Sequence, residues 1–372
     1  LVDGEIRVSD IQEVDIIDLL GRDPVPPVPE LLAKNIQNKM VLVTGAGGSI
    51  GSELCRQIVK NKPKALVIYE LTEFALYSID KELRLNSDVT IIPILGSVLD
   101  QAKLERVMEQ YAIQTVYHAA AYKHVPLVEC NPLAGLKNNA IGTAFSLNAA
   151  VKTGVETFVL ISTDKAVRPT NVMGASKRMA ELYCQAMAEA QDQTQISIVR
   201  FGNVLGSSGS VVPLFKQQIA KGGPITVTHP EVTRYFMTIP EASQLVIQAG
   251  ALGQGGDVFL LDMGEPVRIQ DLARQMIALS GLKVRETGSQ EGDIEIQYSG
   301  LRPGEKLYEE LLIDADNTEV TQHSRILRSY EKMYPLDELL MVFERMHDLT
   351  AIQSDIDWAL AQLEHYVDGY VR

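Results

Sequence analysis

The fold is decided by the stretch Thr44-Gly45-Ala46-Gly47-Gly48-Ser49-Ile50-Gly51. It follows the β-branched run of residues 40–44, which we expect to be a buried parallel strand, and it precedes an expected helix at residues 50–60. In such a turn the first glycine permits the tight bend, the second lets backbone approach a pyrophosphate, and the third lets the helix pack on the strand. The free amides of the helix N-terminus then bind the phosphates. The expected contacts are Gly45, Gly48, Ser49, Ile50 and Gly51.

A carboxylate at the end of the second expected strand completes this pattern. Glu70 follows the run of residues 65–69 and lies 19 residues after Gly51. A carboxylate about 20 residues after the glycine turn binds the ribose hydroxyls of NAD. Glu70 would repel the additional phosphate of NADP, and no Lys or Arg occupies the next several positions. We therefore expect NAD as the cofactor.

Strands and helices alternate along the first half of the chain, which predicts an α/β fold with a doubly wound parallel sheet. The expected strands are residues 40–44, 65–69, 90–95, 115–119, 157–161 and 196–200, and the expected helices are residues 50–60, 73–85, 102–111, 133–153 and 174–189.

After residue 202 the alternation is replaced by loops rich in Gly and Pro, with helices expected at residues 241–252, 269–280, 335–345 and 352–367. We expect three regions: an N-terminal arm or linker (1–38), an NAD-binding domain (39–202), and a smaller, mixed substrate-binding region with a C-terminal helix (203–372).

The N-terminal region contains a short apolar segment at residues 15–20 and a proline-rich run at residues 21–29. Prolines remove backbone donors and disfavour helix at the preceding residue, so this run is not expected to be regular. It is either an extended arm packed on the body or a linker to something upstream. The chain starts at Leu1 and not at Met, from which we expect that it was cut from a longer protein.

The composition excludes several classes of function. A formal net charge of −14 with no basic patch argues against nucleic-acid binding. Cys55, Cys130 and Cys184 are far apart, as in a protein with reduced thiols, and neither they nor the six histidines have metal-ligand spacing. No apolar run reaches the length of a membrane span, and no signal peptide is present, so we expect a cytoplasmic chain.

Polar residues follow the fifth expected strand, where parallel sheets bind their ligands. Thr163, Asp164 and Lys165 come directly after residues 157–161 and would lie over the nicotinamide. Met173 and Lys177 share a face of the next helix because they are four residues apart.

The chain resembles an extended short-chain dehydrogenase/reductase with a Rossmann-type fold. It resembles most the membrane-anchored bacterial UDP-N-acetylglucosamine 4,6-dehydratases of polysaccharide and glycan synthesis. Besides the glycine turn and residues 139–143, the stretches that carry the resemblance are DLLGRDPVP at 18–26, AAAYKHVPLVE at 119–129, STDK at 162–165, DKAVRPTNVMG at 164–174, RFGNV at 200–204 and LRPGEK at 301–306. They span nearly the whole chain.

The resemblance implies an elimination in three stages. The 4-hydroxyl of the sugar is oxidised, the 6-hydroxyl leaves as water after a base removes the proton on carbon 5, and hydride returns to carbon 6. It implies Lys165 as the carbon-5 base, since burial and the charge of Lys177 would lower its pKa. Asp164 would protonate the leaving hydroxyl, Thr163 would hold the 4-oxygen, and Lys177 would bind the nicotinamide ribose.

One position departs from the wider superfamily. Most members carry a Tyr where this chain has Met173, and Met cannot titrate. The membrane-anchored branch also has Met there, so the base for the first step must be another group, with Asp164 as the candidate.

The resemblance implies further binding residues. For the cofactor they are Ser97, Val98, Ala119, Ala120 and Ala121. For the nucleotide and sugar they are Lys123, Asn203, Val211, Thr226, Arg234, Arg302 and Glu305, with the two arginines on phosphate.

Two alternatives remain open at the level of sequence. A 4-epimerase would share the first oxidation but would need neither Asp164 nor Lys165 for elimination. A catalytically silent NAD-binding sensor would explain Met173 but not the retained Lys177. From the superfamily we also expect a homodimer through the helices of residues 133–153 and 174–189, and a membrane anchor upstream of this chain.

Overall fold

The computed structural model describes residues 25–286, 289, 291–310 and 318–372, so the predicted segment at residues 15–20 lies outside it. The chain forms two compact units. We call the larger one the sheet unit; it consists of Pro26–Phe201, Pro240–Asp262 and Glu310–Arg372. The smaller unit contains Gly202–Ile239 and Met263–Glu309. The predicted linear boundary at residue 202 is where the chain first leaves the sheet unit, but the chain returns to that unit twice, which the division into 39–202 and 203–372 did not anticipate.

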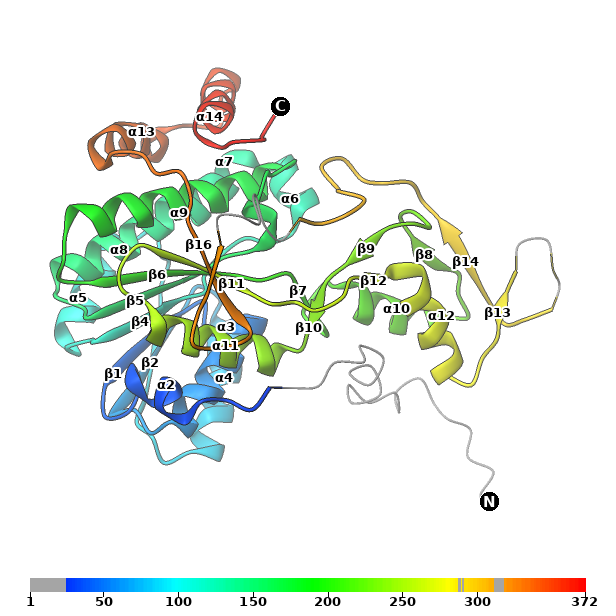
Figure 1. The fold of residues 1–372 in the computed structure, drawn as a ribbon, viewed down its shortest axis with the longest axis horizontal. Coiled ribbons are helices and arrows are strands. Elements are labelled where there is room, and N and C mark those ends of the chain that lie inside the picture. Colours follow the sequence, from blue (N-terminus) through cyan, green and yellow to red (C-terminus); the bar gives the residue numbers. More distant parts are fainter. Residues whose placement is uncertain (1–24, 287–288, 290, 311–317) are drawn as a thin grey trace. The chain divides into compact units, whose positions relative to one another are not determined.

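The sheet unit is built on one mixed sheet, confirming the predicted doubly wound α/β fold (Figure 1). Within the described residues the strand order is β15-β16-β11-β6-β5-β4-β1-β2-β3. All neighbours from β3 to β11 are parallel, whereas β16 is antiparallel to β11 and to β15. The strands are β1 (Met40–Thr44), β2 (Ala65–Glu70), β3 (Ile91–Leu95), β4 (Thr115–His118), β5 (Thr157–Ile161), β6 (Gln195–Arg200), β11 (Asp257–Leu261), β15 (Thr318–Val320) and β16 (Ile326–Ser329).

Helices flank this sheet. They are α2 (Pro29–Lys34), α3 (Ser49–Lys60), α4 (Glu73–Asn86), α5 (Gln101–Gln110), α6 (Val125–Cys130), α7 (Pro132–Leu136), α8 (Gly142–Lys152), α9 (Val172–Ala190), α11 (Ile239–Leu252), α13 (Leu336–Asp348) and α14 (Gln353–Tyr366). Between α7 and α8 the chain forms one π-helical turn, η2 (Lys137–Ile141), and after β5 a 3₁₀ turn, η3 (Asp164–Ala166). None of the helices in the described part of the chain is long and apolar enough to cross a membrane.

The described part of the N-terminal region packs on the body as an arm. Helix α2 begins at Pro29, where a missing N–H costs no helix bond. The backbone N–H of Val28 donates to Gln248 Oε1 at 2.8 Å, and Asn35 Nδ2 donates to the carbonyl of Gly250 at 3.0 Å. Both acceptors lie on α11, so residues 28–35 are held by the sheet unit and do not form a free linker.

The C-terminal helices cover α9. Figure 1 shows α13 and α14 beside α9, and the Tyr183 and Phe343 rings pack with centroids 4.6 Å apart. Every residue of α9 from Val172 to Ala186 is buried within the single chain. The homodimer expected through the helices of residues 133–153 and 174–189 stays a prediction.

The smaller unit has its own apolar core, formed by side chains such as Phe215, Ile225, Leu272 and Ile294. Its elements are β7 (Asn203–Val204), α10 (Val211–Ala220), β8 (Ile225–Val227), β9 (Thr233–Arg234), β10 (Phe236–Met237), β12 (Val267–Arg268), α12 (Ile269–Leu279), β13 (Val284–Arg285) and β14 (Ile294–Tyr298). Of these, only α12 was predicted from the sequence.

Candidate active site

The glycine turn joins β1 to α3 and packs tightly against neighbouring backbone. Gly45 has φ +64°, and a Cβ there would lie 2.7 Å from the backbone of Ala120. A Cβ on Gly51 would overlap the carbonyl oxygen of Gly45, so only glycine lets α3 start this close to the turn. The backbone N–H of Gly48 donates to that same carbonyl at 3.0 Å. Helix α3 has neither a side-chain cap nor an acidic residue in its first turn, which leaves its N-terminal amides suited to a phosphate.

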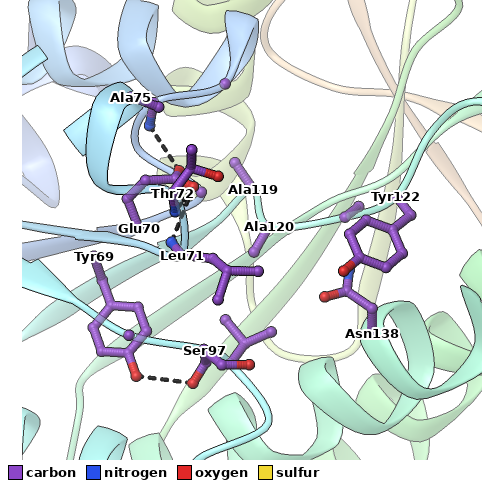
Figure 2. A pocket seen from close by; sticks show the side chains of 16 residues that line it. Tyr69, Glu70, Leu71, Thr72, Ala75, Ser97, Ala119, Ala120, Tyr122 and Asn138 are labelled. Atoms are coloured by element: carbon purple, nitrogen blue, oxygen red, sulfur yellow. Dashed lines mark hydrogen bonds between the residues drawn. The ribbon is translucent and has the colours of Figure 1, made fainter. Parts of the chain in front are cut away.

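A cavity of about 280 Å³ opens beside this turn (Figure 2). Most of its lining residues lie at the ends of β1, β2, β3 and β4, while Ala75 belongs to α4 and Asn138 to η2. Eight of the predicted cofactor residues are among them: Gly45, Gly48, Glu70, Ser97, Val98, Ala119, Ala120 and Ala121. The sequence did not single out the others, which are Gly47, Tyr69, Leu71, Thr72, Ala75, Gly96, Tyr122 and Asn138. Ser49, Ile50, Gly51 and Lys177 lie outside this lining.

Glu70 is held in place at the cavity by backbone amides. Its Oε2 accepts from the N–H of Gly47 at 3.0 Å, and its Oε1 accepts from Leu71 at 2.9 Å and Thr72 at 3.0 Å. Figure 2 shows the Glu70 side chain beside Leu71 and Thr72. Three amide donors fix the orientation of this carboxylate and leave it an acceptor for further donors, such as ribose hydroxyls.

The predicted catalytic triplet forms a tight polar cluster after β5. Lys165 Nζ lies 3.1 Å from Asp164 Oδ1, and Thr163 Oγ1 donates to the same oxygen at 2.9 Å. The Asp164 side chain is buried, whereas that of Lys165 is 24% exposed. Asp164 also donates its backbone N–H to the carbonyl of Phe201 at 3.1 Å. The structure thus brings an acid and a base of opposite charge into contact at the carboxyl edge of the sheet.

Lys177 lies beneath this cluster on α9. Its Nζ donates to the carbonyl of Ile161, the last residue of β5, at 2.8 Å. Burial lowers the pKa of Lys177 from 10.5 to about 8, although the nearby carboxylate of Glu181 opposes this shift. Met173 is buried in the main apolar core, as expected for a methionine that does no proton chemistry.

Asn139 is a buried polar residue for which the sequence analysis predicted no role in the site. It belongs to the π-helical turn η2, a geometry often found at functional sites. Its Nδ2 donates to Ser176 Oγ at 2.9 Å and to the carbonyl of Tyr122 at 3.0 Å. Asn139 therefore connects α9, at the residue directly before Lys177, to the loop at the cavity. The signal available in the sequence was the Asn139-Ala140-Ile141-Gly142-Thr143 stretch itself.

A second residue without a predicted role is His118, at the end of β4. Its ring nitrogens contact Thr44 Oγ1 at 2.8 Å and Thr143 Oγ1 at 3.1 Å. Burial, reinforced by the charge of Lys177, lowers the pKa of His118 to about 3. The imidazole is thus neutral at physiological pH and supports the strand ends without adding charge.

A buried ion network supports the strand end that carries the triplet. Ser162 Oγ donates to Glu181 Oε1 at 2.6 Å, and Arg200 Nε donates to the same oxygen at 2.8 Å. Glu331 pairs with Arg200 and, at 3.1 Å, with Arg178. Burial alone would raise the pKa of Glu181, but the two arginines outweigh it and lower that pKa. Two carboxylates and two guanidinium groups thus compensate one another directly behind Thr163.

The smaller unit gathers its own charged residues. Arg234 pairs with Glu305 at 3.0 Å and with Glu309 at 3.2 Å, and Asn203 Nδ2 donates to Glu309 at 3.4 Å. Glu305 Oε2 also accepts from the backbone N–H of Arg302 at 3.1 Å. Four predicted nucleotide residues, Asn203, Arg234, Arg302 and Glu305, are therefore linked in one cluster, and the unpredicted Glu309 joins Asn203 to Arg234.

Three further predicted substrate residues are Val211 and Thr226 in the smaller unit and Lys123 in the sheet unit. Val211 is the first residue of α10, and Thr226 is the central residue of β8, where its hydroxyl accepts from Gln218 at 2.8 Å. Lys123 follows β4 in the sheet unit and is exposed.

The three cysteines are free thiols. Among the described residues, no group of three His, Cys, Asp or Glu side chains could hold a metal ion.

Residues 41–331 match the family described as polysaccharide biosynthesis protein. The chain belongs to this family. It is 49% identical over 346 residues to the capsular polysaccharide biosynthesis protein CapD of Staphylococcus aureus, covering 92% of this chain and 57% of CapD. It is 52% identical over 311 residues to the probable polysaccharide biosynthesis protein EpsC of Bacillus subtilis (strain 168), covering 83% of this chain and 51% of EpsC. The chain thus spans little more than half the length of these curated relatives.

Proteins with other names are also similar. A UDP-glucose 4-epimerase of Rickettsia canadensis (strain McKiel) is 32% identical over 286 residues, which are 75% of this chain and 79% of that protein. The X-ray structure of Pen from Bacillus thuringiensis has a TM-score of 0.72 and 32% identity, covering 81% of this chain and 91% of Pen. DesIV, a dTDP-glucose 4,6-dehydratase from Streptomyces venezuelae with NAD and TYD bound, has a TM-score of 0.62 at 20% identity, covering 73% and 88%, which shows a shared fold. These matches confirm the prediction of an extended short-chain dehydrogenase/reductase of polysaccharide biosynthesis.

Proposed function

We propose that this chain is the catalytic portion of an NAD-dependent 4,6-dehydratase that acts on a UDP-sugar, namely UDP-N-acetylglucosamine. The observation that carries the proposal is the contact of Lys165 Nζ with Asp164 Oδ1 at 3.1 Å, at the carboxyl edge of a sheet whose neighbouring strand ends form the glycine-turn cavity. An elimination needs a base and an acid side by side, and this pair supplies both.

The cavity fits NAD in two respects. At Gly45 and Gly51 neighbouring backbone lies so close that a side chain could not be accommodated. A turn packed this tightly lets backbone approach a pyrophosphate. The oriented Glu70 carboxylate suits the ribose hydroxyls. When bound, NAD accepts hydride from carbon 4 of the sugar and returns it to carbon 6. The buried Lys177 ammonium would donate hydrogen bonds to the ribose hydroxyls. Its positive charge would also stabilise the alkoxide that develops on the 4-oxygen during the oxidation.

The Asp164–Lys165 pair performs the elimination without net change of charge. Transfer of one proton from the Lys165 ammonium to the contacting carboxylate gives a neutral amine beside a neutral carboxylic acid. The amine removes the proton on carbon 5, which the 4-ketone has acidified, and the acid protonates the 6-hydroxyl so that it leaves as water. The pair ends as it began, as an ammonium beside a carboxylate. The Thr163 hydroxyl would hold the 4-oxygen during these steps.

The first oxidation also needs a proton acceptor, and Met173 cannot be one. Asp164 in its ionised form is the nearest carboxylate to Thr163 in the cluster, so we assign it this role as well. The proton that Asp164 takes from the 4-hydroxyl passes to solvent, so that the ammonium–carboxylate pair is restored before the elimination. As hydride reaches carbon 6, the Lys165 ammonium returns a proton to carbon 5 and the amine recovers a proton from solvent. On this account one carboxylate serves two consecutive steps.

The test is to incubate the purified chain with UDP-N-acetylglucosamine without added reductant and to follow the nucleotide sugar by mass spectrometry. Loss of one water, with a trappable 4-ketone, supports the dehydratase. Lys165→Ala should keep NAD binding and lose turnover, whereas Lys152→Ala, which changes an exposed lysine paired with Glu105, should keep both.

A second candidate, a UDP-sugar 4-epimerase, is favoured by the similarity to the Rickettsia epimerase. An unchanged mass with an altered sugar NMR spectrum would identify it and would refute the dehydratase. NAD binding with no change in any of several UDP-sugars would instead indicate a silent NAD-binding protein. The homodimer, the cytoplasmic location and the upstream membrane anchor remain predictions about the longer protein.

A further inference from the structure

The loop between β5 and α9, residues 162–171, carries Asp164 and Lys165 and runs unusually close to α9. A Cβ on Gly174, in the first turn of α9, would overlap the carbonyl oxygen of Lys165 and would lie 3.0 Å from Pro169 Cβ. The loop backbone thus occupies the space that a side chain at position 174 would need. Asn171 fixes the end of the loop, since its Oδ1 accepts from the N–H of Gly174 at 2.8 Å. Gly174 therefore determines how near Lys165 lies to the helix.

A second glycine contacts the same loop from the C-terminal segment. Arg168 has φ +40°, a conformation that is strained for a residue with a side chain. Gly369 has φ +87°, and a Cβ there would lie 2.9 Å from Arg168 Cβ and 3.0 Å from Arg168 Cα. The backbone at Gly369 therefore packs directly on the strained residue of the loop. Strain of this kind persists only where surrounding contacts hold it.

The C-terminal segment is anchored well enough to hold that contact. Val367 and Tyr370 are buried in the main apolar core, and the N–H of Tyr370 donates to the carbonyl of Val367 at 3.1 Å. The N–H of Arg372 donates to Glu364 on α14 at 2.9 Å. Gly369 thus lies in a short turn between two buried side chains, and the residues after it are hydrogen-bonded to α14 of the sheet unit.

The same segment also adjoins the residue that holds the far end of the loop. Glu129 Oε1 accepts from the N–H of Val172, the first residue of α9, at 2.6 Å. Burial raises the pKa of Tyr370 to about 12, and the nearby charge of Glu129 contributes to this shift. The direct contact between the segment and the loop is therefore the one at Arg168, and the charge of Glu129 acts on Tyr370 in the same segment.

We propose that residues 367–370 are a positioning element of the active site: Gly369 holds the loop that carries Asp164 and Lys165, while Gly174 supports that loop from α9. The segment lies beyond residues 41–331, the part of the chain that matches the family. The inference rests on the proposed function in so far as it treats Asp164 and Lys165 as reacting groups. Reacting groups misplaced by about 1 Å lose on the order of 100-fold in rate, so a small shift of the loop is measurable.

The test compares two glycines of similar backbone geometry. In Gly369→Ala the new methyl group meets Arg168, whereas in Gly154→Ala, at φ +74°, it meets nothing within 4 Å. Both variants carry the same backbone strain, so any difference between them reports the contact with the loop. We expect kcat of Gly369→Ala to fall by about tenfold or more. The KM for the UDP-sugar should match that of Gly154→Ala, whereas the thermal midpoint of Gly369→Ala should be lower, because its methyl group overpacks Arg168.

A second readout does not require turnover. Amide hydrogen exchange at residues 164–171 should accelerate in Gly369→Ala and not in Gly154→Ala. If Gly369→Ala does not fold, Tyr370→Ala removes the anchor without introducing a clash, with the exposed Val371→Ala as its control. We expect the same acceleration in Tyr370→Ala.

The outcomes separate the two proposals. A wild-type chain that dehydrates no UDP-sugar refutes the proposed function, and hydrogen exchange then decides the positioning role alone. If the wild type is active and Gly369→Ala matches Gly154→Ala in both kcat and loop exchange, the positioning element is refuted while the dehydratase stands. A loss of kcat in Gly369→Ala together with faster loop exchange supports both.

Discussion

The cofactor cavity of the sheet unit and the arginine cluster of the smaller unit are built in opposite ways. The cavity is shaped by side chains that are missing, as at Gly45 and Gly51, and by backbone amides that orient Glu70. The cluster is held by full charges, with Arg234 between Glu305 and Glu309. The first region should therefore be sensitive to added volume and the second to altered charge. Four predictions test this difference, from the largest expected effect to the smallest.

Gly51→Ala should disrupt the cavity most. The new methyl group would overlap a backbone oxygen, which cannot move aside as a flexible side chain can. We expect a loss of stability of roughly 3 kcal/mol, at the upper end for overpacking, and NAD affinity lower by about 100-fold. Chemical denaturation and NAD titration measure the two effects.

Gly48→Ala is the matched control, because its methyl group would lie 3.3 Å from the carbonyl oxygen of Gly45. It should spare stability and weaken NAD binding alone, since the second glycine faces the pyrophosphate. Equal losses of stability in the two variants would contradict a turn shaped by the third glycine.

Lys177 is a buried charge in the sheet unit, and its titration should change the free energy of unfolding. Its folded pKa of about 8 lies below the unfolded value of 10.5, so the folded state disfavours the ammonium form. The cost to stability is present in full below pH 8 and is relieved as pH rises from 8 to 10.5, because the unfolded chain then binds more protons. It amounts to roughly 3 kcal/mol.

Urea denaturation of wild type and Lys177→Met between pH 7 and pH 10 measures this cost. The difference in unfolding free energy between the two proteins should be constant near pH 7 and should change by up to that amount toward pH 10. A difference that is independent of pH would show that Lys177 titrates normally.

Arg234→Ala should affect only the charged region. Hydrogen bonds to a charged group contribute about 1.5–3 kcal/mol, so UDP affinity should fall by roughly 10- to 100-fold while NAD affinity is retained. Isothermal titration with each ligand distinguishes the two. Unchanged UDP affinity would exclude Arg234 from the nucleotide site.

Glu309→Gln should have the smallest effect and the opposite sign. Removing one of the two carboxylates that neutralise Arg234 leaves more of its charge for a phosphate, which we estimate at about 1 kcal/mol, or roughly fivefold tighter UDP binding. Glu231→Gln, which changes an exposed carboxylate paired with Arg268 in the same unit, should leave UDP affinity unchanged. Weaker binding by Glu309→Gln would mean that Glu309 itself contacts the nucleotide.

The sequence predicted β1 to β6 and their helices because each of these elements has a local signal. The run at β1 is apolar and β-branched, and the turn after it needs glycine for its backbone geometry. Strands β11 and β16 were not predicted, although they extend the same sheet. Their partners are distant in sequence, and no local pattern indicates that residues 257–261 pair with β6.

The candidate site divides in the same way. Residues that follow a strand end, such as Glu70 and Asp164, could be predicted because the carboxyl ends of parallel strands meet at one edge. Glu309, Asn139 and Gly369 could not be assigned roles, since their contacts arise from packing between segments far apart in the chain.

The interleaving of the two units has a consequence for synthesis on the ribosome. Strand β6 ends at Arg200, but its neighbour β11 begins only at Asp257, after the chain has left the sheet unit and returned. A nascent chain therefore presents the apolar, unpaired edge of β6 while Gly202–Ile239 is being made, and such an edge is a template for pairing with other chains. Truncated products that end between these two strands should aggregate, and slow translation through residues 202–256 should lower the yield of folded protein.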